Sequence, residues 1–382
     1  MKYIESLSRK SVLILSLIVL VIVGAIDSAT GVELSFSILY LLPIALVTWY
    51  IGRWAGVTMS IVCAMVWYLS DLLSSPSYSS PIVPYWNATV MLGFFLTTAL
   101  VLSTLRRTID RDNSLAREIQ VRLLPAEMPI VPGYEIAGAW RPAHSVGGDY
   151  YDVIPVNGKS LVLCVADVVG HGMPAALLMS NLQAAVRMLV LSKTSPRDVC
   201  AQLNTLIAGN STSDKFISIF YSVLDVETQE ITYTNAGHPP PVIIRNNGET
   251  VSLGEGGIPI GMLPGYSYDQ GRTRLGTEDL LAIYTDGVTE VSNARGEQFG
   301  EKRVLDILKE NHRRGANASC NAVIDAVSEF SNGNYLDDIA LLVVTSSGID
   351  GAKQAVHATS PTERIETSEG EQTFSELSTK GR

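Results

Sequence analysis

The apolar residues of this chain are distributed very unevenly, and this asymmetry constrains its fold more than any other feature. Four stretches nearly free of charge occupy the first hundred residues, at approximately 11–25, 36–51, 54–73 and 89–105. A membrane-spanning helix needs about 20 apolar residues, and aromatic residues at the interface, such as Trp49, Tyr50 and Trp54, can complete the shorter spans. The sequence therefore predicts an all-α membrane bundle over residues 1–105, with about four transmembrane helices.

Basic residues flank these stretches on one side only. In chain order they are Lys2, Arg9, Lys10, Arg53, Arg106, Arg107 and Arg111. The loops on the opposite side carry Asp27, Glu33 and Asp71 but no Lys or Arg. Because Lys and Arg mark cytoplasmic loops, we expect a multi-pass membrane protein with both termini in the cytoplasm. A cleaved signal peptide is the alternative for the first stretch, but the three later stretches favour a bundle.

A charged segment with helical spacing of its apolar residues follows at 106–124. Its apolar positions include Ile109, Leu115 and Ile119, which predicts an amphipathic helix that continues the fourth span. This linker is either a passive connection or a signalling helix that pairs with a second copy in a coiled coil. The second interpretation implies a homodimer.

Beyond the linker the pattern changes to short apolar runs separated by Gly, Pro and Asn, as in LVLCVAD, EITYTNAG and DDIALLVVT. Such runs indicate strands, and helical periodicity over Met173–Leu191, Ser195–Ala208 and Glu301–His312 indicates helices. We expect an α+β domain over residues 125–346. The polar tail at 347–382 is predicted to be disordered.

Charge and cysteine content exclude several classes of protein. The formal net charge is −10, and no basic cluster suited to a phosphate backbone is found, so nucleic acid is not the expected partner. The four cysteines form neither a CxxC pair nor a dense disulfide framework. They are expected to be buried thiols in a reducing compartment, and they are Cys63, Cys164, Cys200 and Cys320.

Acidic residues recur beside the predicted strands. Six of them adjoin the runs GGDYYD, LVLCVA, LLAIYT and IALLVV, namely Asp149, Asp152, Asp167, Asp286, Asp337 and Asp338. Taken singly, such an Asp is commonly a turn residue that accepts backbone N–H bonds. Together they predict a rim of carboxylates that repel one another unless cations neutralise them. Oxygen ligands without a His or Cys cluster favour Mg²⁺ or Mn²⁺ over Zn²⁺.

Several segments occur in an order and at a spacing that carry a family resemblance. They are RPAHSVGGDYYD, VADVVGHGMPAALLMS, TNAGHPPPVII, GIPIGM, YTDGVTEVSNARGEQFG and LDDIALLVV. The soluble half thereby resembles the metal-dependent (PPM, type-2C) protein phosphatases, in the bacterial branch typified by the stage II sporulation protein E (SpoIIE) phosphatase domain. This resemblance implies a PPM-type β-sandwich flanked by helices, with two or more divalent ions, Mn²⁺ or Mg²⁺. The ligands that it implies are Asp149, Asp167, the backbone carbonyl of Val168, Asp286 and Asp337.

The resemblance also implies the reaction and the partner. The expected activity is hydrolysis of phosphoserine or phosphothreonine on a regulatory protein in signal transduction, such as an anti-sigma-factor antagonist. A leaving alkoxide needs a proton, which His171 or His238 can supply, with metal-bound water as the alternative. Ala340 stands where the family usually has Thr after the paired acids, so we expect the missing hydroxyl to weaken metal affinity.

Two other functions fit parts of the chain. One is a non-catalytic membrane receptor whose phosphatase-like domain binds a phosphoprotein without hydrolysing it. The complete set of Asp149, Asp167, Asp286 and Asp337 argues against that function. The other is a transporter with an attached regulatory domain, which the predicted spans disfavour because they contain no internal Asp, Glu or Lys.

Overall fold

The computed structural model describes residues 8–30, 36–73, 80–192, 195–210 and 215–347. The chain divides into two compact units, residues 1–119 and 120–382. The predicted disorder of the tail concerns residues that, apart from Ser347, lie outside the described ranges, as does Glu33.

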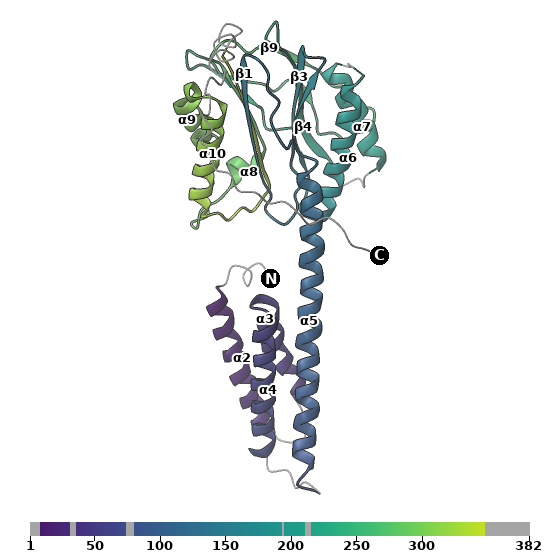
Figure 1. The fold of residues 1–382 in the computed structure, drawn as a ribbon, viewed down its shortest axis with the longest axis vertical. Coiled ribbons are helices and arrows are strands. Elements are labelled where there is room, and N and C mark those ends of the chain that lie inside the picture. Colours follow the sequence, from purple (N-terminus) through teal and green to yellow (C-terminus); the bar gives the residue numbers. More distant parts are fainter. Residues whose placement is uncertain (1–7, 31–35, 74–79, 193–194, 211–214, 348–382) are drawn as a thin grey trace, which may run out of the picture. The chain divides into compact units, whose positions relative to one another are not determined.

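The first unit consists of helices (Figure 1). They are α2 (Arg9–Thr30), the 3₁₀ helix η2 (Ser37–Tyr40), α3 (Leu41–Tyr50), α4 (Arg53–Leu73) and α5 (Val83–Val121). Tyr40, Ile44 and Phe95 are completely buried between them, whereas Val21 is 69% exposed and Trp54 is 76% exposed. Helices that are apolar on their outer surface as well as between one another suit a lipid environment.

Four helices of the described residues are long and apolar enough to cross a membrane, namely α2, α4, α5 and α6 (Met173–Val190). Of these, α6 lies in the second unit and packs on strands there, so its apolar face is explained by the protein core. The apolar segment Ser37–Tyr50 is shorter than the other candidates. The second predicted span is therefore a helical segment below the usual spanning length of about 20 residues.

An acidic residue that was predicted to lie in a loop, Asp27, is part of a helix. Helix α2 continues past the first apolar stretch to Thr30, which places Asp27 within the helix and buries it to 8% exposure. Its carboxylate accepts hydrogen bonds from the Phe36 backbone N–H and the Tyr40 hydroxyl, each at 3.2 Å. These bonds provide the partners that a buried carboxylate requires.

Helix α5 includes most of the predicted linker. It is 39 residues long and runs without interruption from Val83 to Val121. The charged segment that begins at Arg106 is thus a direct continuation of the preceding apolar helix, as its periodicity predicted. Its last two residues, Gln120 and Val121, belong to the second unit.

The second unit is built on two sheets. One has the strand order β1-β11-β10-β6-β7, and the other has the order β2-β3-β4-β5-β8 with β9 paired to β5. All pairs with a determined register are antiparallel except β5 with β8. The strands are β1 (Tyr134–Arg141), β2 (Tyr150–Val156), β3 (Ser160–Val168), β4 (Ile217–Asp225), β5 (Glu230–Ala236), β6 (Val242–Ile244), β7 (Thr250–Ser252), β8 (Gly256–Gly257), β9 (Gly271–Arg274), β10 (Leu280–Tyr284) and β11 (Ile339–Ser346).

Helices cover the outer faces of the two sheets (Figure 1). On one side, α6 and α7 (Pro196–Asn210) contact strands of the β2-containing sheet, and on the other side α10 (Ala316–Ser331) contacts β1 and β11. The remaining helices are α8 (Asp286–Glu290), α9 (Glu301–Asn311) and the 3₁₀ helix η3 (His312–Arg314). The predicted α+β sandwich flanked by helices is confirmed, and all four cysteines are free and buried as expected.

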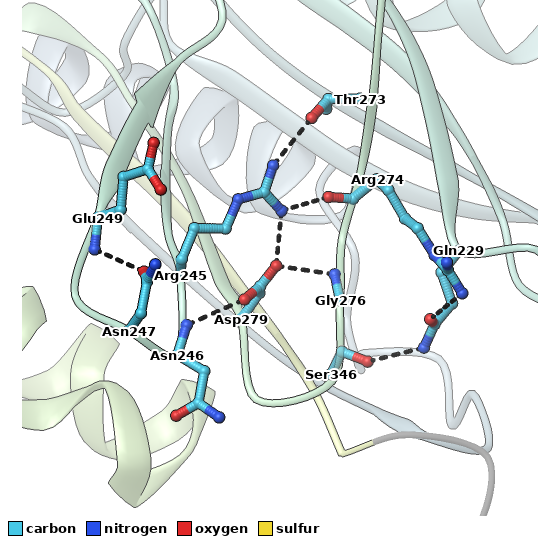
Figure 2. Close-up of polar contacts among 10 residues, drawn as sticks. All are labelled: Gln229, Arg245, Asn246, Asn247, Glu249, Thr273, Arg274, Gly276, Asp279 and Ser346. Carbon is cyan, nitrogen blue, oxygen red and sulfur yellow. Dashed lines mark hydrogen bonds and ion pairs between the residues drawn. The ribbon is translucent and has the colours of Figure 1, made fainter.

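A cluster of polar contacts around an ion pair lies at the end where β10 begins (Figure 2). Arg245, just after β6, donates from Nη1 to Oδ2 of Asp279 at 2.6 Å, and its Nη2 donates to the Thr273 hydroxyl of β9 at 3.2 Å. Asp279 also accepts the backbone N–H of Asn246 at 3.1 Å and that of Gly276 at 2.8 Å. These contacts connect β6, β9 and β10, and they leave the opposite end of β10 for the acids.

Candidate metal centre

The antiparallel pairing of the strands brings four of the predicted acids to one end of the sandwich. Asp149 immediately precedes β2 and Asp167 is the penultimate residue of β3, and these two strands pair with Tyr150 opposite Ala166. In the other sheet Asp286 follows β10 and Asp337 precedes β11, and these strands pair with Tyr284 opposite Leu341. Each sheet therefore contributes two acids at the same edge.

A hydrogen bond connects the two sheets at this edge. The Thr285 hydroxyl, between β10 and α8, donates to Oδ2 of Asp149 at 2.7 Å and accepts the backbone N–H of Ala340 at 2.9 Å. Asp149 is only 1% exposed and Thr285 is fully buried. The hydroxyl thus fixes one carboxylate oxygen of Asp149.

The carboxylates of this rim repel one another. Burial and the neighbouring Asp167 charge raise the pKa of Asp149 well above its usual range. Burial, followed by the charges of Asp286 and Asp337, raises the pKa of Asp167 to about 7. Burial also raises the pKa values of Asp286 and Asp338, with a contribution from Asp337 in each case. Bound cations would relieve this repulsion, as would protons.

The donor chemistry of the rim fits hard divalent cations. Carboxylate oxygens from both sheets are present, and Gly148 lies so close to Val168 that a Cβ at Gly148 would be 2.9 Å from the Val168 carbonyl oxygen. Within the described residues, no three acidic, His or Cys side chains already form a compact metal cage. The carboxylates are close enough to raise one another's pKa values.

Hydrogen bonds from several elements hold the backbone of the loop that carries Asp149. Gln120, in the last turn of α5, accepts the Gly147 N–H at 3.0 Å and donates from Nε2 to the Gly147 carbonyl at 2.6 Å. The Asp338 carboxylate accepts the Gly148 N–H at 2.6 Å. The Trp140 indole donates to the Asp149 carbonyl at 3.0 Å. The position of Asp149 therefore depends on α5, β1 and the start of β11 together.

Three of these supporting residues had no distinguishing signal in the sequence. Gln120 reads as one more polar position of an amphipathic helix, and Trp140 and Thr285 read as ordinary strand residues. Asp338 was identified as part of the acidic pair, but the structure gives it a role apart from that of Asp337. It is 3% exposed and binds the Ala143 N–H at 2.8 Å in addition to Gly148.

Asp152 does not belong to the rim, although it lies in the same GGDYYD segment. It is inside β2 and fully buried, where it binds the Tyr150 hydroxyl at 2.8 Å and Arg187 of α6 at 2.8 Å. The prediction that Asp152 lies at the end of a strand is therefore wrong. The pairing with Arg187 explains an acidic residue at this depth, because buried acidic groups require a partner.

The two candidate proton donors lie in different environments. His238 is 3% exposed, its Nδ1 lies 3.0 Å from the Ser218 hydroxyl, and burial lowers its pKa to about 3. It is therefore neutral at physiological pH and poorly suited to donate a proton. His171 is exposed in the loop after β3, and its ring stacks on that of His144. His144 was not singled out from the sequence.

Comparison with known proteins agrees with this fold. A family model described as stage II sporulation protein E (SpoIIE) matches residues 157–347, half of the chain. These residues include Asp167, Asp286 and Asp337, whereas Asp149 lies before the match begins. The phosphoserine phosphatase RsbU of Bacillus subtilis is 28% identical over 259 residues, which cover 67% of this chain and 76% of RsbU.

Solved structures give the same fold. The RsbU and RsbW domains of Rv1364c from Mycobacterium tuberculosis superpose with a TM-score of 0.53 at 26% identity, over 59% of this chain and 63% of that one. The SiaA-PP2C domain of Pseudomonas aeruginosa gives a TM-score of 0.55 at 20% identity, over 63% of this chain and 97% of that one.

Proposed function

The chain belongs to the stage II sporulation protein E (SpoIIE) family of metal-dependent serine/threonine phosphatases, and from this premise we propose that it is a membrane-anchored enzyme that dephosphorylates a regulatory protein. The observation that carries the proposal is the rim of acids contributed by both sheets. Buried carboxylates that raise one another's pKa values are a costly arrangement, and such arrangements concentrate at functional sites.

The acids of the rim would hold two or more Mn²⁺ or Mg²⁺ ions. The proposed ligands are Asp149, Asp167, the Val168 carbonyl, Asp286 and Asp337. When bound, such ions supply an activated water and positive charge for the phosphoryl oxygens. The protein's own part is to orient Asp149 through Thr285 and to keep its loop in place through Gln120 and Asp338.

His171 is the proposed proton donor to the departing serine or threonine oxygen. It lies three residues beyond Val168 in an exposed loop, where a substrate side chain can approach it from solvent. Positioned general acids of this kind contribute about 10²- to 10⁴-fold to rate. His238, being buried and neutral, is left with a structural role beside Ser218.

The proposed substrate is a phosphorylated regulatory protein, such as an anti-sigma-factor antagonist. Support comes from the similarity to RsbU, which is described as a phosphoserine phosphatase. The net charge of −10 further disfavours nucleic acid as an alternative partner.

The proposed location is the bacterial inner (plasma) membrane, with both termini and the phosphatase domain in the cytoplasm. Support comes from the length and apolar composition of α2, α4 and α5 and from the basic residues that flank the apolar stretches. The proposed domains are the membrane bundle at 1–105, the linker helix at 106–124 and the phosphatase domain at 125–346. Pairing of two linker helices would give a homodimer.

The test is hydrolysis by the full-length chain reconstituted in phospholipid nanodiscs. We expect Mn²⁺-dependent release of phosphate from a phosphoserine protein and from p-nitrophenyl phosphate, and loss of both activities in Asp149→Asn and Asp286→Asn. Asp225→Asn is the matched control, because Asp225 ends β4 opposite Ser160 and therefore lies at the far end of the sheet from Asp167. A folded protein that binds Mn²⁺ and the phosphoprotein but releases no phosphate would identify a receptor instead.

A further inference from the structure

We propose that His144 is a positioning residue that holds the His171 imidazole at the acidic rim through ring stacking. The proposal rests on the proposed function, since it assigns His171 its orientation for protonating the leaving oxygen. Neither the family comparison nor the acid pattern points to His144. The observation behind the proposal is the contact between two loops that both adjoin predicted metal ligands.

The two rings form a parallel stack. Their centroids are 5.1 Å apart and their planes differ by 17°. His144 lies in the loop between β1 and β2, five residues before Asp149, and His171 lies in the loop between β3 and α6, four residues after Asp167. Both side chains are exposed, so burial in the core does not explain their contact. Exposed rings that stack in this way gain a modest but geometrically specific interaction energy.

Glycine residues flank His171 on both sides. Gly170 and Gly172 on either side have φ angles of +97° and +73°, values that L side chains rarely adopt. Within the described residues, the stack is the determined contact that restrains the His171 ring. An imidazole between two such glycines would otherwise sample many orientations, and few of these would direct a nitrogen towards the rim.

The His144 loop, in contrast, is fixed. Asp338 accepts the N–H of Ala143 at 2.8 Å and that of Gly148 at 2.6 Å, so one carboxylate ties the loop on both sides of His144. Val146 anchors the same loop with 3% exposure. His144 thus lies on a restrained segment and can orient the His171 ring through the stack. Sites are most precise when their groups are held by such supporting contacts.

The chemical step defines what orientation must achieve. Hydrolysis forms a bond from a water oxygen to phosphorus and breaks the bond from phosphorus to the serine oxygen. The proton that water loses balances the proton that the serine oxygen gains from His171. A misdirected imidazole slows only this transfer, whereas p-nitrophenolate is a stable anion that departs without a proton. The two substrates therefore report on the donor differently.

The experiment compares kcat for a phosphoserine protein with kcat for p-nitrophenyl phosphate, using the full-length chain in nanodiscs at saturating Mn²⁺. We expect the ratio of the two to fall about 100-fold in His171→Ala, in line with the loss of a general acid, and about tenfold in His144→Ala. His144→Phe should stay within about threefold of the wild-type ratio, because phenylalanine can stack but has no ring nitrogen. The double alanine variant should match His171→Ala, since residues acting through one group are not additive.

Three outcomes would overturn the positioning role. They are an equal loss for both substrates in His144→Ala, a failure of His144→Phe to retain the ratio, and a double variant in which the two single losses multiply. The last result would mean that His144 contacts the substrate independently. If the wild-type chain hydrolyses neither substrate, the proposed function itself has failed, and that result is distinguishable from the other three.

Discussion

Removing the side-chain amide of Gln120 should loosen the Asp149 loop and weaken metal binding. Gln120→Met keeps the length and helix propensity of the side chain but eliminates its bonds of 3.0 Å and 2.6 Å to Gly147. Gln120 is only 3% exposed, so water does not readily replace the lost partner. Each buried group left unpaired costs about 1–3 kcal/mol.

We expect about 1.4–2.8 kcal/mol of this cost to appear in metal affinity, because the loop must be rebuilt around Asp149 when the ions bind. That free energy corresponds to an increase of about 10- to 100-fold in the Mn²⁺ concentration for half-maximal activity. The turnover number at saturating Mn²⁺ should change much less. The assay is a Mn²⁺ titration of p-nitrophenyl phosphate hydrolysis by full-length protein in nanodiscs.

Gln183→Met is the matched control for this titration. Gln183 of α6 also contacts the segment at the end of α5, through a bond of 3.2 Å from Nε2 to the Leu123 carbonyl, but it makes no determined bond to the Asp149 loop. Its loss should lower thermal stability slightly and leave the Mn²⁺ midpoint in place. An unchanged midpoint in Gln120→Met, or an equal shift in both variants, would refute the argument that Gln120 positions Asp149.

Three further predictions concern stability and metal affinity. Burial lowers the folded-state pKa of His238 to about 3, so its contribution to stability is complete above pH 6.5 and is lost as the pH falls. Between pH 6.5 and 4.5 the unfolding free energy measured in urea should therefore decrease by about 2–3 kcal/mol less in His238→Gln than in wild type. Parallel pH profiles of the two proteins would contradict this prediction. Asp279→Ala should lower the unfolding free energy by about 2–4 kcal/mol, because it removes the carboxylate partner of Arg245 and leaves two backbone N–H groups unpaired. Glu227→Ala, at an exposed ion pair, should change the unfolding free energy little, and similar losses in both variants would contradict this prediction. Ala340→Thr should lower the Mn²⁺ midpoint while reducing the melting temperature, since Ala340 is fully buried and the larger side chain overpacks its site; unchanged turnover and affinity would dismiss the role expected for this position.

The sequence was most informative where a periodic apolar run ended at a recognisable turn. The runs that became β3, β5 and β11 and the helices α6, α7 and α9 were identified from such patterns. Strand β2 begins within GGDYYD and carries a buried ion pair at Asp152. This acidic residue interrupts the apolar pattern by which a strand is recognised. Helix α10 shows apolar spacing but lies among Asn and Ser residues, which weaken the propensity signal.

The candidate site shows a similar division. Asp149, Asp167, Asp286 and Asp337 are predictable as a group because strand ends converge in antiparallel sheets. The residues that orient them, such as Gln120, are selected by contacts across more than a hundred positions or between unlike elements. No local pattern encodes such contacts, so only the three-dimensional structure identifies them.

The pairing of β1 with β11 has a consequence for co-translational folding of the domain. Tyr134 lies opposite Ser346 and Arg141 lies opposite Ile339. The first strand of the domain therefore cannot pair until the last strand has been synthesised. The hydrogen bond between the Gly148 N–H and the Asp338 carboxylate likewise joins residues 190 positions apart. Contacts this distant in sequence form late, and domains fold as units during synthesis. A nascent or truncated chain that ends before β11 should therefore lack phosphatase activity, even after its N-terminal helices have been made.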